Sequence, residues 1–171
     1  MPATFGWYVG SDLLMNLKKT ALLLGGVSLL AALWLRWWLR PERQIPRAQA
    51  RLLSHIAKRD FDAMAGMLAA DYRDRWQHDK AAVIGRSREV FSQFLTLTIG
   101  RESRGLHAGP GSWFLEEKVT LKGIGSPLAM AARDTLNAFH QPFFTEWRQR
   151  SWKPWDWELK SVAQPELEPP E

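Results

Sequence analysis

Three side chains, Glu117, Asp74 and His78, stand at positions from which they could move protons. Glu117 shares one face of a predicted strand with four apolar residues, which are Trp113, Leu115, Val119 and Leu121. Desolvation by such neighbours raises the pKa of a carboxyl group, which permits proton transfer near neutral pH. Asp74 and His78 are four residues apart, so a helical segment would place them on one face as an acid–base pair.

Each of these side chains also has a structural role open to it, and we favour the structural roles. Glu117 would pair with an arginine on a neighbouring strand, or a bulge would turn it outward. Asp74 and His78 would cap a helix end or lie at the surface. His107, in a turn, and His140, near a helix end, are expected at the solvated surface. No catalytic residue is therefore assigned, and Glu117, Asp74 and His78 remain candidates.

Other chemistries find little support in the sequence. Two histidines spaced for metal binding do not occur, there is no cysteine, and no serine occupies a nucleophile elbow. The glycines do not form a phosphate-binding loop. We therefore expect no metal site and no cofactor. The tryptophan-rich segment 143–162 could stack on bases or sugars, but alternating tryptophans are more typical of a core.

The charge distribution excludes a nucleic-acid partner. The chain carries a net charge of +5, yet up to Arg40 it holds four basic residues and one acidic residue. The remaining 131 residues hold nineteen basic and seventeen acidic side chains, a balance too even for a phosphate-binding surface. Most of the positive excess therefore flanks the apolar segment that lies near the N-terminus.

Residues 20–39, TALLLGGVSLLAALWLRWWL, predict a transmembrane anchor. Twenty helical residues span about 30 Å, the thickness of a bilayer core. At the membrane interface we expect the aromatic and basic side chains of one end, which favour the headgroup layer: Trp34, Arg36, Trp37, Trp38 and Arg40. The lipid bilayer is thus the first expected partner.

Two alternatives to the anchor fit the segment less well. A cleaved signal peptide needs a small-x-small site, and none lies between Ala32 and Arg36. A buried helix that is apolar all round needs a larger shell than the remaining chain supplies. We expect translation to start at Met15, because the two lysines that follow it resemble a secretory leader. The expected location is a bacterial inner membrane, with the domain on the extracytoplasmic side.

Four helices and four strands are predicted beyond the anchor. Apolar spacing predicts a helix pair over residues 43–70, broken near Asp60 as N-cap, and a third helix over 80–94 capped by Asp79. Alternation predicts strands over 95–99, 113–122, 143–152 and 155–162, the last two joined by a tight turn at Lys153-Pro154. A turn is expected over 107–111.

A further helix is predicted between the second and third strands. Ser126 is a suitable N-cap, Pro127 suits the first helical position, and Pro142 sets a limit beyond the end. Its inner face is expected to be Leu128, Ala131, Ala132, Thr135, Leu136 and Phe139. The chain is thereby divided into a tail (1–19), an anchor (20–40), a domain (41–163) and a disordered C-terminal tail (164–171).

Helices followed by an antiparallel meander form an α+β layer. With the phrase Leu68-Ala69-Ala70-Asp71-Tyr72 and the segment 151–157, SWKPWDW, this order resembles the nuclear transport factor 2-like superfamily, which includes SnoaL-type and ketosteroid-isomerase-type proteins. It is most similar to uncharacterised membrane-anchored bacterial versions. The resemblance implies a cone in which helices pack on a curved antiparallel sheet, and it covers about residues 41–167.

The resemblance also implies a pocket inside the cone. We expect Trp113, Leu115, Trp147 and Trp157 to line it, while the helix after Pro127 departs from the family pattern and would plug or roof it. The expected function is a noncatalytic module that holds a small apolar ligand or an envelope protein, with a homodimer formed through the sheet. The alternative is an isomerase- or dehydratase-like enzyme, because enzymes of this fold place a carboxylate or histidine in the cone.

Overall fold

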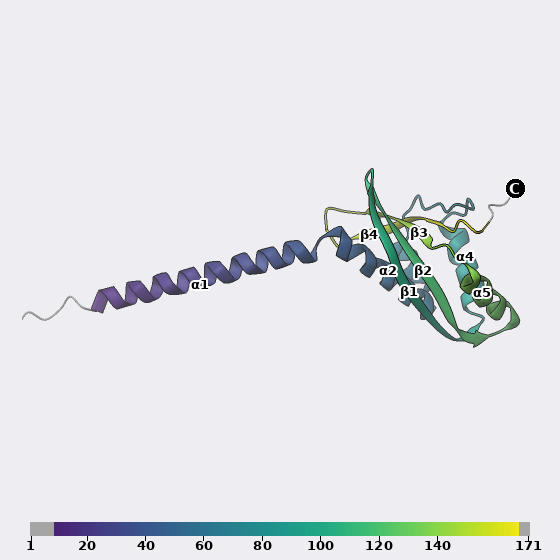
Figure 1. Cartoon of the computed structure of the whole chain (residues 1–171), viewed down its shortest axis with the longest axis horizontal. Coiled ribbons are helices and arrows are strands. Elements are labelled where there is room, and N and C mark those ends of the chain that lie inside the picture. The colour runs from purple at the N-terminus through teal and green to yellow at the C-terminus, as the bar shows by residue number, and fades with distance from the viewer. Residues whose placement is uncertain (1–8, 168–171) are drawn as a thin grey trace, which may run out of the picture. The chain divides into compact units, whose positions relative to one another are not determined.

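The computed structural model describes residues 9–167, with side chains from residue 22 onward. The chain forms two compact units, Met1–Arg40 and Pro41–Glu171, which are described separately (Figure 1).

The first unit is built on one helix, α1 (Val9–Trp38). From Leu22 onward its leucine and tryptophan side chains are largely exposed, and Leu22 and Leu30 are 77% and 67% accessible. The rings of Trp34 and Trp38 stack with their centroids 5.3 Å apart. Within the described residues no single helix is long and apolar enough to cross a membrane, and only Leu22–Trp38 and Pro41–Ala57 taken together meet that test.

Three helices open the second unit. They are α2 (Pro41–Ala57), α3 (Phe61–Met67) and α4 (Lys80–Phe91). The predicted caps are confirmed, since Asp60 accepts from Ala63 N at 3.0 Å and Asp79 accepts from Ala82 N at 2.8 Å. The predicted helix pair is also confirmed, although α3 is short and ends before the expected Ala70.

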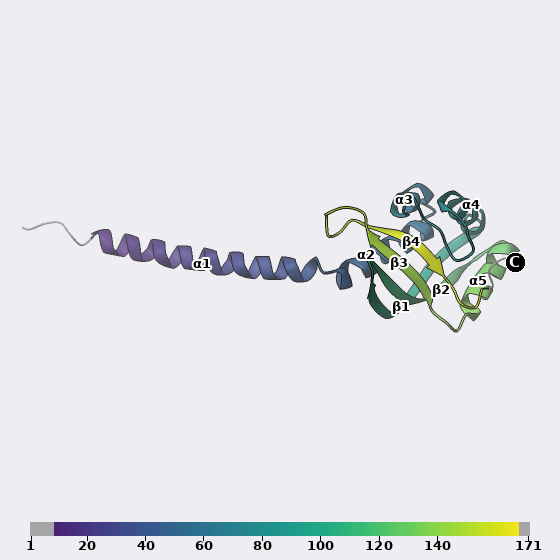
Figure 2. The same ribbon diagram turned by 90° about the horizontal axis from the view of Figure 1, so that it is seen from above.

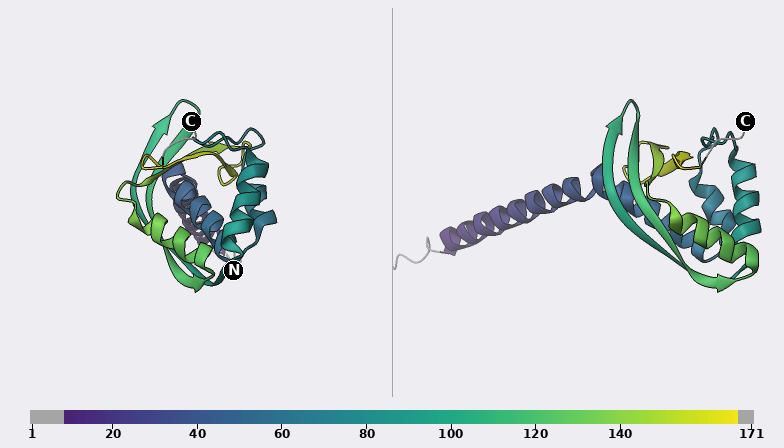
Figure 3. Two further views of the ribbon diagram at one scale, coloured as in Figure 1. Left: turned by 90° about the vertical axis from the view of Figure 1, so that its right-hand side faces the viewer. Right: turned by 45° about the vertical axis from the view of Figure 1, so that its right-hand side comes forward.

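Four antiparallel strands form one curved sheet in the order β1-β2-β3-β4 (Figures 2 and 3). They are β1 (Phe94–Gly109), β2 (Ser112–Gly125), β3 (Phe143–Gln149) and β4 (Trp157–Ala163). The expected turn over 107–111 is shorter than predicted, because His107 pairs with Phe114 and only residues 110–111 lie between the strands. Gly111 has φ of +74°, which favours glycine in this tight turn.

The predicted tight turn between the last two strands is wrong. Residues 150–156 form a seven-residue loop, so Trp152 and Trp155 lie outside the strands. The two strands do pair antiparallel, and Trp147 lies opposite Leu159 and Gln149 opposite Trp157. The loop carries its own hydrogen bonds, which compete with continuation of the strand ladder.

The predicted helix after Ser126 is α5 (Pro127–Ala138), and Ser126 Oγ accepts from Ala129 N at 3.3 Å. Its inner face differs from the prediction, because Ala129 is buried while Leu128 is 49% exposed. The amide of Asn137 bonds both backbone groups of Leu121 at 2.8 Å. The helix α5 therefore packs on the part of β2 beyond residue 117, where β3 no longer pairs with β2. Because the helix approaches the strand closely, it requires a small residue at the contact.

The core lies between α2 and the concave face of the sheet. Ile45 and Ala48 of α2 are fully buried in one cluster with Leu115 and Trp147 of the sheet. The indole N–H of Trp147 donates to Thr145 Oγ1 at 3.1 Å, so the largest buried ring leaves no donor without a partner.

Polar contacts hold two segments of this unit in place, the connection after α3 and residues 164–167. Arg148 donates to both carboxylate oxygens of Asp71 at 2.7 and 3.0 Å and also to Glu158 Oε1, which ties the connection after α3 to the sheet. Residues 164–167 are not a free tail, because Gln164 is fully buried and Glu166 accepts from the backbone N–H groups of His140 and Gln141. Residues 168–171 lie outside the described part.

Substitution of the central tryptophan is expected to cost much more than substitution of an exposed one. Trp147→Ala should lower the free energy of unfolding by about 3–5 kcal/mol, because it opens a large cavity in the core. The matched control is Trp152→Ala, at a side chain that is 84% exposed, for which we expect a change within about 0.5 kcal/mol. Urea denaturation of the full chain in mild detergent measures both, and equal losses would contradict the packing described.

The Asp71–Arg148 contact predicts a pH dependence of stability. The hydrogen bond from Arg148 holds the pKa of the Asp71 carboxyl below its ordinary value. A lowered folded-state pKa adds stability above about pH 4, and that stability is lost as the pH falls through the folded-state value. Asp71→Asn should therefore lower the urea midpoint at pH 7 and leave it unchanged near pH 2. A midpoint that falls equally at both pH values would show that the carboxylate charge is not involved.

Candidate functional site

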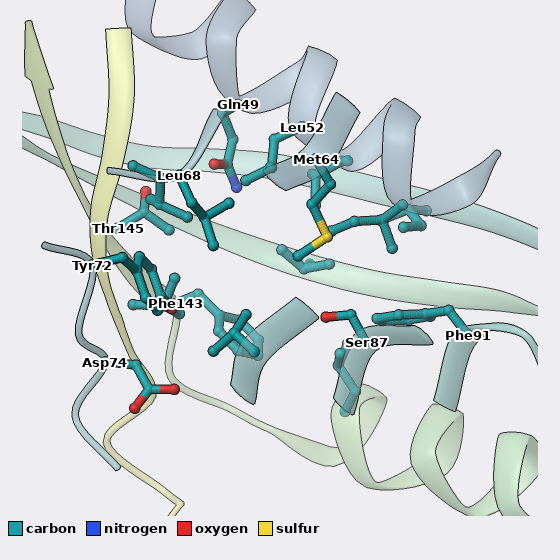
Figure 4. A pocket seen from close by; sticks show the side chains of 18 of the residues that line it. Gln49, Leu52, Met64, Leu68, Tyr72, Asp74, Ser87, Phe91, Phe143 and Thr145 are labelled. Carbon is teal, nitrogen blue, oxygen red and sulfur yellow. The ribbon is translucent and has the colours of Figure 1, made fainter. Parts of the chain in front are cut away.

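A cavity of about 280 Å³ lies between the helices and the concave face of the sheet (Figure 4). Its walls come from the C-terminal half of α2, from α3 and α4, and from all four strands. Twenty residues line it, and most of them are aliphatic or aromatic. The lining side chains with polar atoms that concern us are Gln49, Tyr72, Asp74, Ser87 and Thr145. Such a space favours an apolar occupant with a few polar contacts.

The four expected lining residues, Trp113, Leu115, Trp147 and Trp157, do not line this cavity. Leu115, Trp147 and Trp157 are buried members of the core cluster, and Trp113 packs against that cluster. The cavity adjoins α2 from Gln49 onward, and Trp157 lines a separate hollow beside Arg51 and His55. Of the strand face predicted from alternation, Val119 and Leu121 are the residues that reach the cavity.

Glu117 is fully buried but is not among the residues that line the cavity. Its Oε1 accepts from Arg101 at 2.9 Å, and Arg101 also donates to the carbonyl of Pro46 at 3.1 Å. Arg101 lies on β1, so this is the ion pair with a neighbouring strand that the sequence offered as the structural role. The pair joins β1, β2 and the first half of α2.

Asp74 and His78 do come together, although not on a helix. They lie in the connection before α4, where the Asp74 carboxylate accepts from the backbone N–H groups of Trp76 and His78 at 2.9 and 2.8 Å. Asp74 Oδ2 is 3.0 Å from His78 Nδ1. Asp74 is 6% exposed, and the His78 side chain is 25% exposed. The result is a partly exposed imidazole held by a buried carboxylate.

This dyad borders a wider groove outside the cavity. The groove has a volume of about 460 Å³ and shares eight lining residues with the cavity, Asp74 among them. Other residues line the groove but not the cavity, among them His78, Arg86 and, at the α5 end, Thr135 and Phe139. Leu136 of α5 lines both spaces. The helix that departs from the family pattern, α5, therefore forms one wall of the groove, which we call the mouth of the cavity. It leaves the cavity unfilled.

Two polar residues in the cavity were missed by the sequence analysis. Burial, followed by the nearby charge of Asp74, raises the pKa of Tyr72 far above its ordinary value, so its hydroxyl keeps its proton. Gln49 is 2% exposed, and its Oε1 has no hydrogen-bond partner within the described residues. The signal for Gln49 was available, because it lies between Ala48 and Leu52 on the mostly apolar buried face of α2.

The remaining sequence candidates lie away from the cavity. His107 Nε2 is 3.1 Å from Glu116, and His140 Nδ1 is 3.6 Å from Glu166. Both imidazoles are mostly exposed. Among residues 9–167 no group of three or more His, Asp or Glu side chains converges as a metal site would.

Comparison with solved structures assigns the fold. An NTF2-like protein from Cytophaga hutchinsonii superposes with a TM-score of 0.51 at 11% identity, over 72% of this chain and 95% of its own. The domain has the NTF2-like fold. Aln2 from a Streptomyces species gives a TM-score of 0.53 at 12% identity over 72% and 90% of the two chains, and ActVI-ORFA from Streptomyces coelicolor gives 0.50 at 10% over 74% and 95%.

No family model and no curated sequence matches the chain. At these identities the likeness concerns the NTF2-like fold alone, and it confirms the fold expected from the sequence. What the cone holds must be argued from its own residues.

The buried ion pair of the NTF2-like domain gives an asymmetric prediction. Arg101→Met leaves the fully buried Glu117 carboxylate without its cation and should destabilise the protein by about 3–5 kcal/mol. Glu117→Gln leaves Arg101, which is 36% exposed and can be hydrated, so its cost should be smaller. Urea denaturation of both variants measures the difference. The reverse order would place the essential charge on Arg101 instead.

Proposed function

We propose that the NTF2-like domain binds a small, mostly apolar molecule in its cavity, and that residues 20–39 hold the domain at a lipid bilayer. The single observation that carries the first part is the 280 Å³ space with mostly apolar walls between the helices and the sheet. Ligand-binding cavities of proteins begin at about 300 Å³, so the space suits an occupant near the lower limit of that range, such as a single substituted ring.

The side-chain oxygen of Gln49, which has no hydrogen-bond partner within the described residues, indicates which chemical group the bound molecule would carry. A buried acceptor without a partner costs about 1–3 kcal/mol, and a bound molecule with an O–H or N–H group would remove that cost at Gln49 Oε1. In Figure 4 Gln49 and Asp74 lie on opposite sides of the apolar space. A phenol or a cyclic alcohol combines an apolar body with one such donor.

Support for the bilayer comes from the surface of α1. A run of exposed leucines ends at Trp34, Trp37 and Trp38, and Arg36 and Arg40 lie among and after them. Apolar surface of this extent marks a protein or membrane contact, and tryptophan beside arginine is typical of the headgroup layer. We propose that the partner is lipid, in a bacterial inner membrane with the domain on the extracytoplasmic side.

Filling the cavity should weaken binding. The Ser87 side chain lines the space, and Ser87→Phe should weaken the binding of p-cresol about tenfold or more, or about 1.4 kcal/mol. The control is Ser103→Phe, on an exposed position of β1. Isothermal titration calorimetry of the full chain in detergent gives the dissociation constants. Equal binding by both variants would exclude this cavity as the site.

The same assay tests the role of the orphaned amide. The wild-type protein should prefer p-cresol to its analogue toluene by about tenfold, because the phenol donates to Gln49 Oε1. Gln49→Leu should remove that preference while both molecules still bind.

A second candidate function is supported by the Asp74–His78 dyad. A buried carboxylate that orients an imidazole at the mouth of an apolar cavity is suited to general acid–base catalysis, as an isomerase or dehydratase requires. Such an enzyme would remove a proton next to a carbonyl group of a bound ring. Glu117 takes no part in this alternative, since it does not reach the cavity.

The dyad therefore predicts a measurable proton transfer. If the alternative holds, the protein in D₂O should catalyse deuterium exchange next to the carbonyl of 2-tetralone, measured by NMR. Asp74→Asn and His78→Gln should each lower that rate about 100-fold. Asp134→Asn, at an exposed carboxylate on α5, serves as the control. Exchange at the rate of the protein-free solution would leave the domain noncatalytic toward such a ketone.

A further inference from the structure

The loop formed by residues 150–156 exposes two large aromatic rings. Trp152 is 84% exposed and Trp155 is 51% exposed. Tryptophan is strongly buried on average, and ring surface left in water is unfavourable. Neighbouring exposed tryptophans in one loop therefore point to a surface that something covers.

The loop holds this shape by hydrogen bonds of its own. Ser151 Oγ donates to Asp156 Oδ2 at 2.6 Å, and Asp156 N donates to the carbonyl of Lys153 at 3.0 Å. The carbonyl of Pro154 accepts from the indole of Trp157 at 2.8 Å, which ties the loop to the core. Since these bonds fix the loop, the exposure of Trp152 and Trp155 belongs to its folded shape.

A basic hollow of about 360 Å³ is lined in part by Trp155. Its cationic and titratable side chains are those of Arg51, His55, Arg150 and Lys153, together with the acidic Asp156. Arg150 is engaged by Asp156 and Glu158, and His55 Nδ1 is 3.5 Å from Asp60. Within the described residues Arg51 and Lys153 have no ion-pair partner, so they give this face its positive charge.

Both features match the headgroup layer of an anionic bilayer. Indoles favour that layer because the ring is apolar and its N–H seeks a partner, and each lysine or arginine near the surface adds attraction to anionic lipid. The even charge balance of residues 41–171 disfavours nucleic acid as the occupant.

Chain connectivity brings a bilayer to this end of the domain. In Figures 1 and 2 the loop lies at the end of the domain where α2 begins. Since α2 starts at Pro41, one residue beyond Arg40, a membrane that holds residues 20–39 must lie close to that end whatever the angle between the two units. This step rests on the proposed anchor.

We propose that residues 150–156 dock on the headgroup layer of an anionic bilayer, with Trp152 and Trp155 buried in it and Arg51 and Lys153 facing lipid phosphates. Docking gives the tethered domain one orientation. In Figures 1 and 2 α4 and α5, which border the mouth of the cavity, lie at the end of the domain opposite the loop. The mouth then faces the aqueous phase, from which the ligand enters.

The absence of cysteine from the sequence permits a direct test. Single cysteines replace Pro154 in the loop, Leu128 on α5 and Leu30 in α1, and each carries a nitroxide label in the full chain. The labelled proteins are placed in nanodiscs of phosphatidylcholine, with or without phosphatidylglycerol. Collision of the label with a water-soluble nickel chelate is then measured relative to the detergent-solubilised protein.

We expect the chelate to reach the label at 154 several-fold less in nanodiscs with phosphatidylglycerol than in detergent, and the label at 128 equally in both. Lys153→Gln should shift the docked-to-undocked ratio about fivefold toward the undocked state, the effect of losing one interfacial cation. The double substitution Trp152→Ser with Trp155→Ser should restore full access at 154.

The controls separate the two proposals. A protected label at 30 with a fully accessible label at 154 overturns loop docking and leaves the anchor in place, whereas accessible labels at both positions overturn both. Protection at 154 that is already complete in detergent and depends on protein concentration would assign the loop to a contact between copies of the chain and also overturn docking on lipid.

Discussion

The packing of α2 into the concave face of the sheet is the interaction on which the rest of the domain depends. At its N-terminal half Ile45 and Ala48 are fully buried in the cluster that also holds Leu115 and Trp147. At its C-terminal half, from Gln49 onward, the sheet curves away and α3 and α4 close the gap only in part. One helix thus supplies both the tight core and one wall of the cavity, and the curvature of the sheet sets where one becomes the other.

Buried polar groups follow the same division. In the tight half, Glu117 Oε1 accepts from Arg101 and the indole of Trp147 donates to Thr145, whereas Glu117 Oε2 has no hydrogen-bond partner within the described residues. In the open half, Asp74 is compensated by the backbone and by His78, while Gln49 keeps an acceptor free. Of the two carbonyl or carboxylate oxygens without a partner in the described part of the chain, the one at Gln49 belongs to a residue that lines the cavity and the one at Glu117 does not.

The two ends of the domain differ in the elements and surfaces that they present. One end carries the start of α2 and the loop with Trp152 and Trp155, and the other carries α4, α5 and the mouth of the cavity (Figure 2). An anchored domain with this arrangement would meet lipid at one end and its ligand at the other. The helix α5 contributes to that separation, because it bonds to Leu121 and walls the mouth.

The sequence by itself determined which elements form and how they begin. The caps at Asp60, Asp79 and Ser126, the alternation through Leu115 to Leu121, and the order of helices and strands were sufficient for an α+β layer, because each depends on residues close together in the chain. The cone itself was implied by the resemblance to a known superfamily. Only the tertiary structure decided which residues face the cavity. Alternation places Leu115 and Leu121 on one face of β2. Because the sheet curves and α2 crosses only part of it, Leu115 lies in the core and Leu121 lines the cavity. Likewise, the pairing of Glu117 with Arg101 and the exposure of Trp152 follow from register and from a loop whose bonds end the strands early, and neither is set by local spacing.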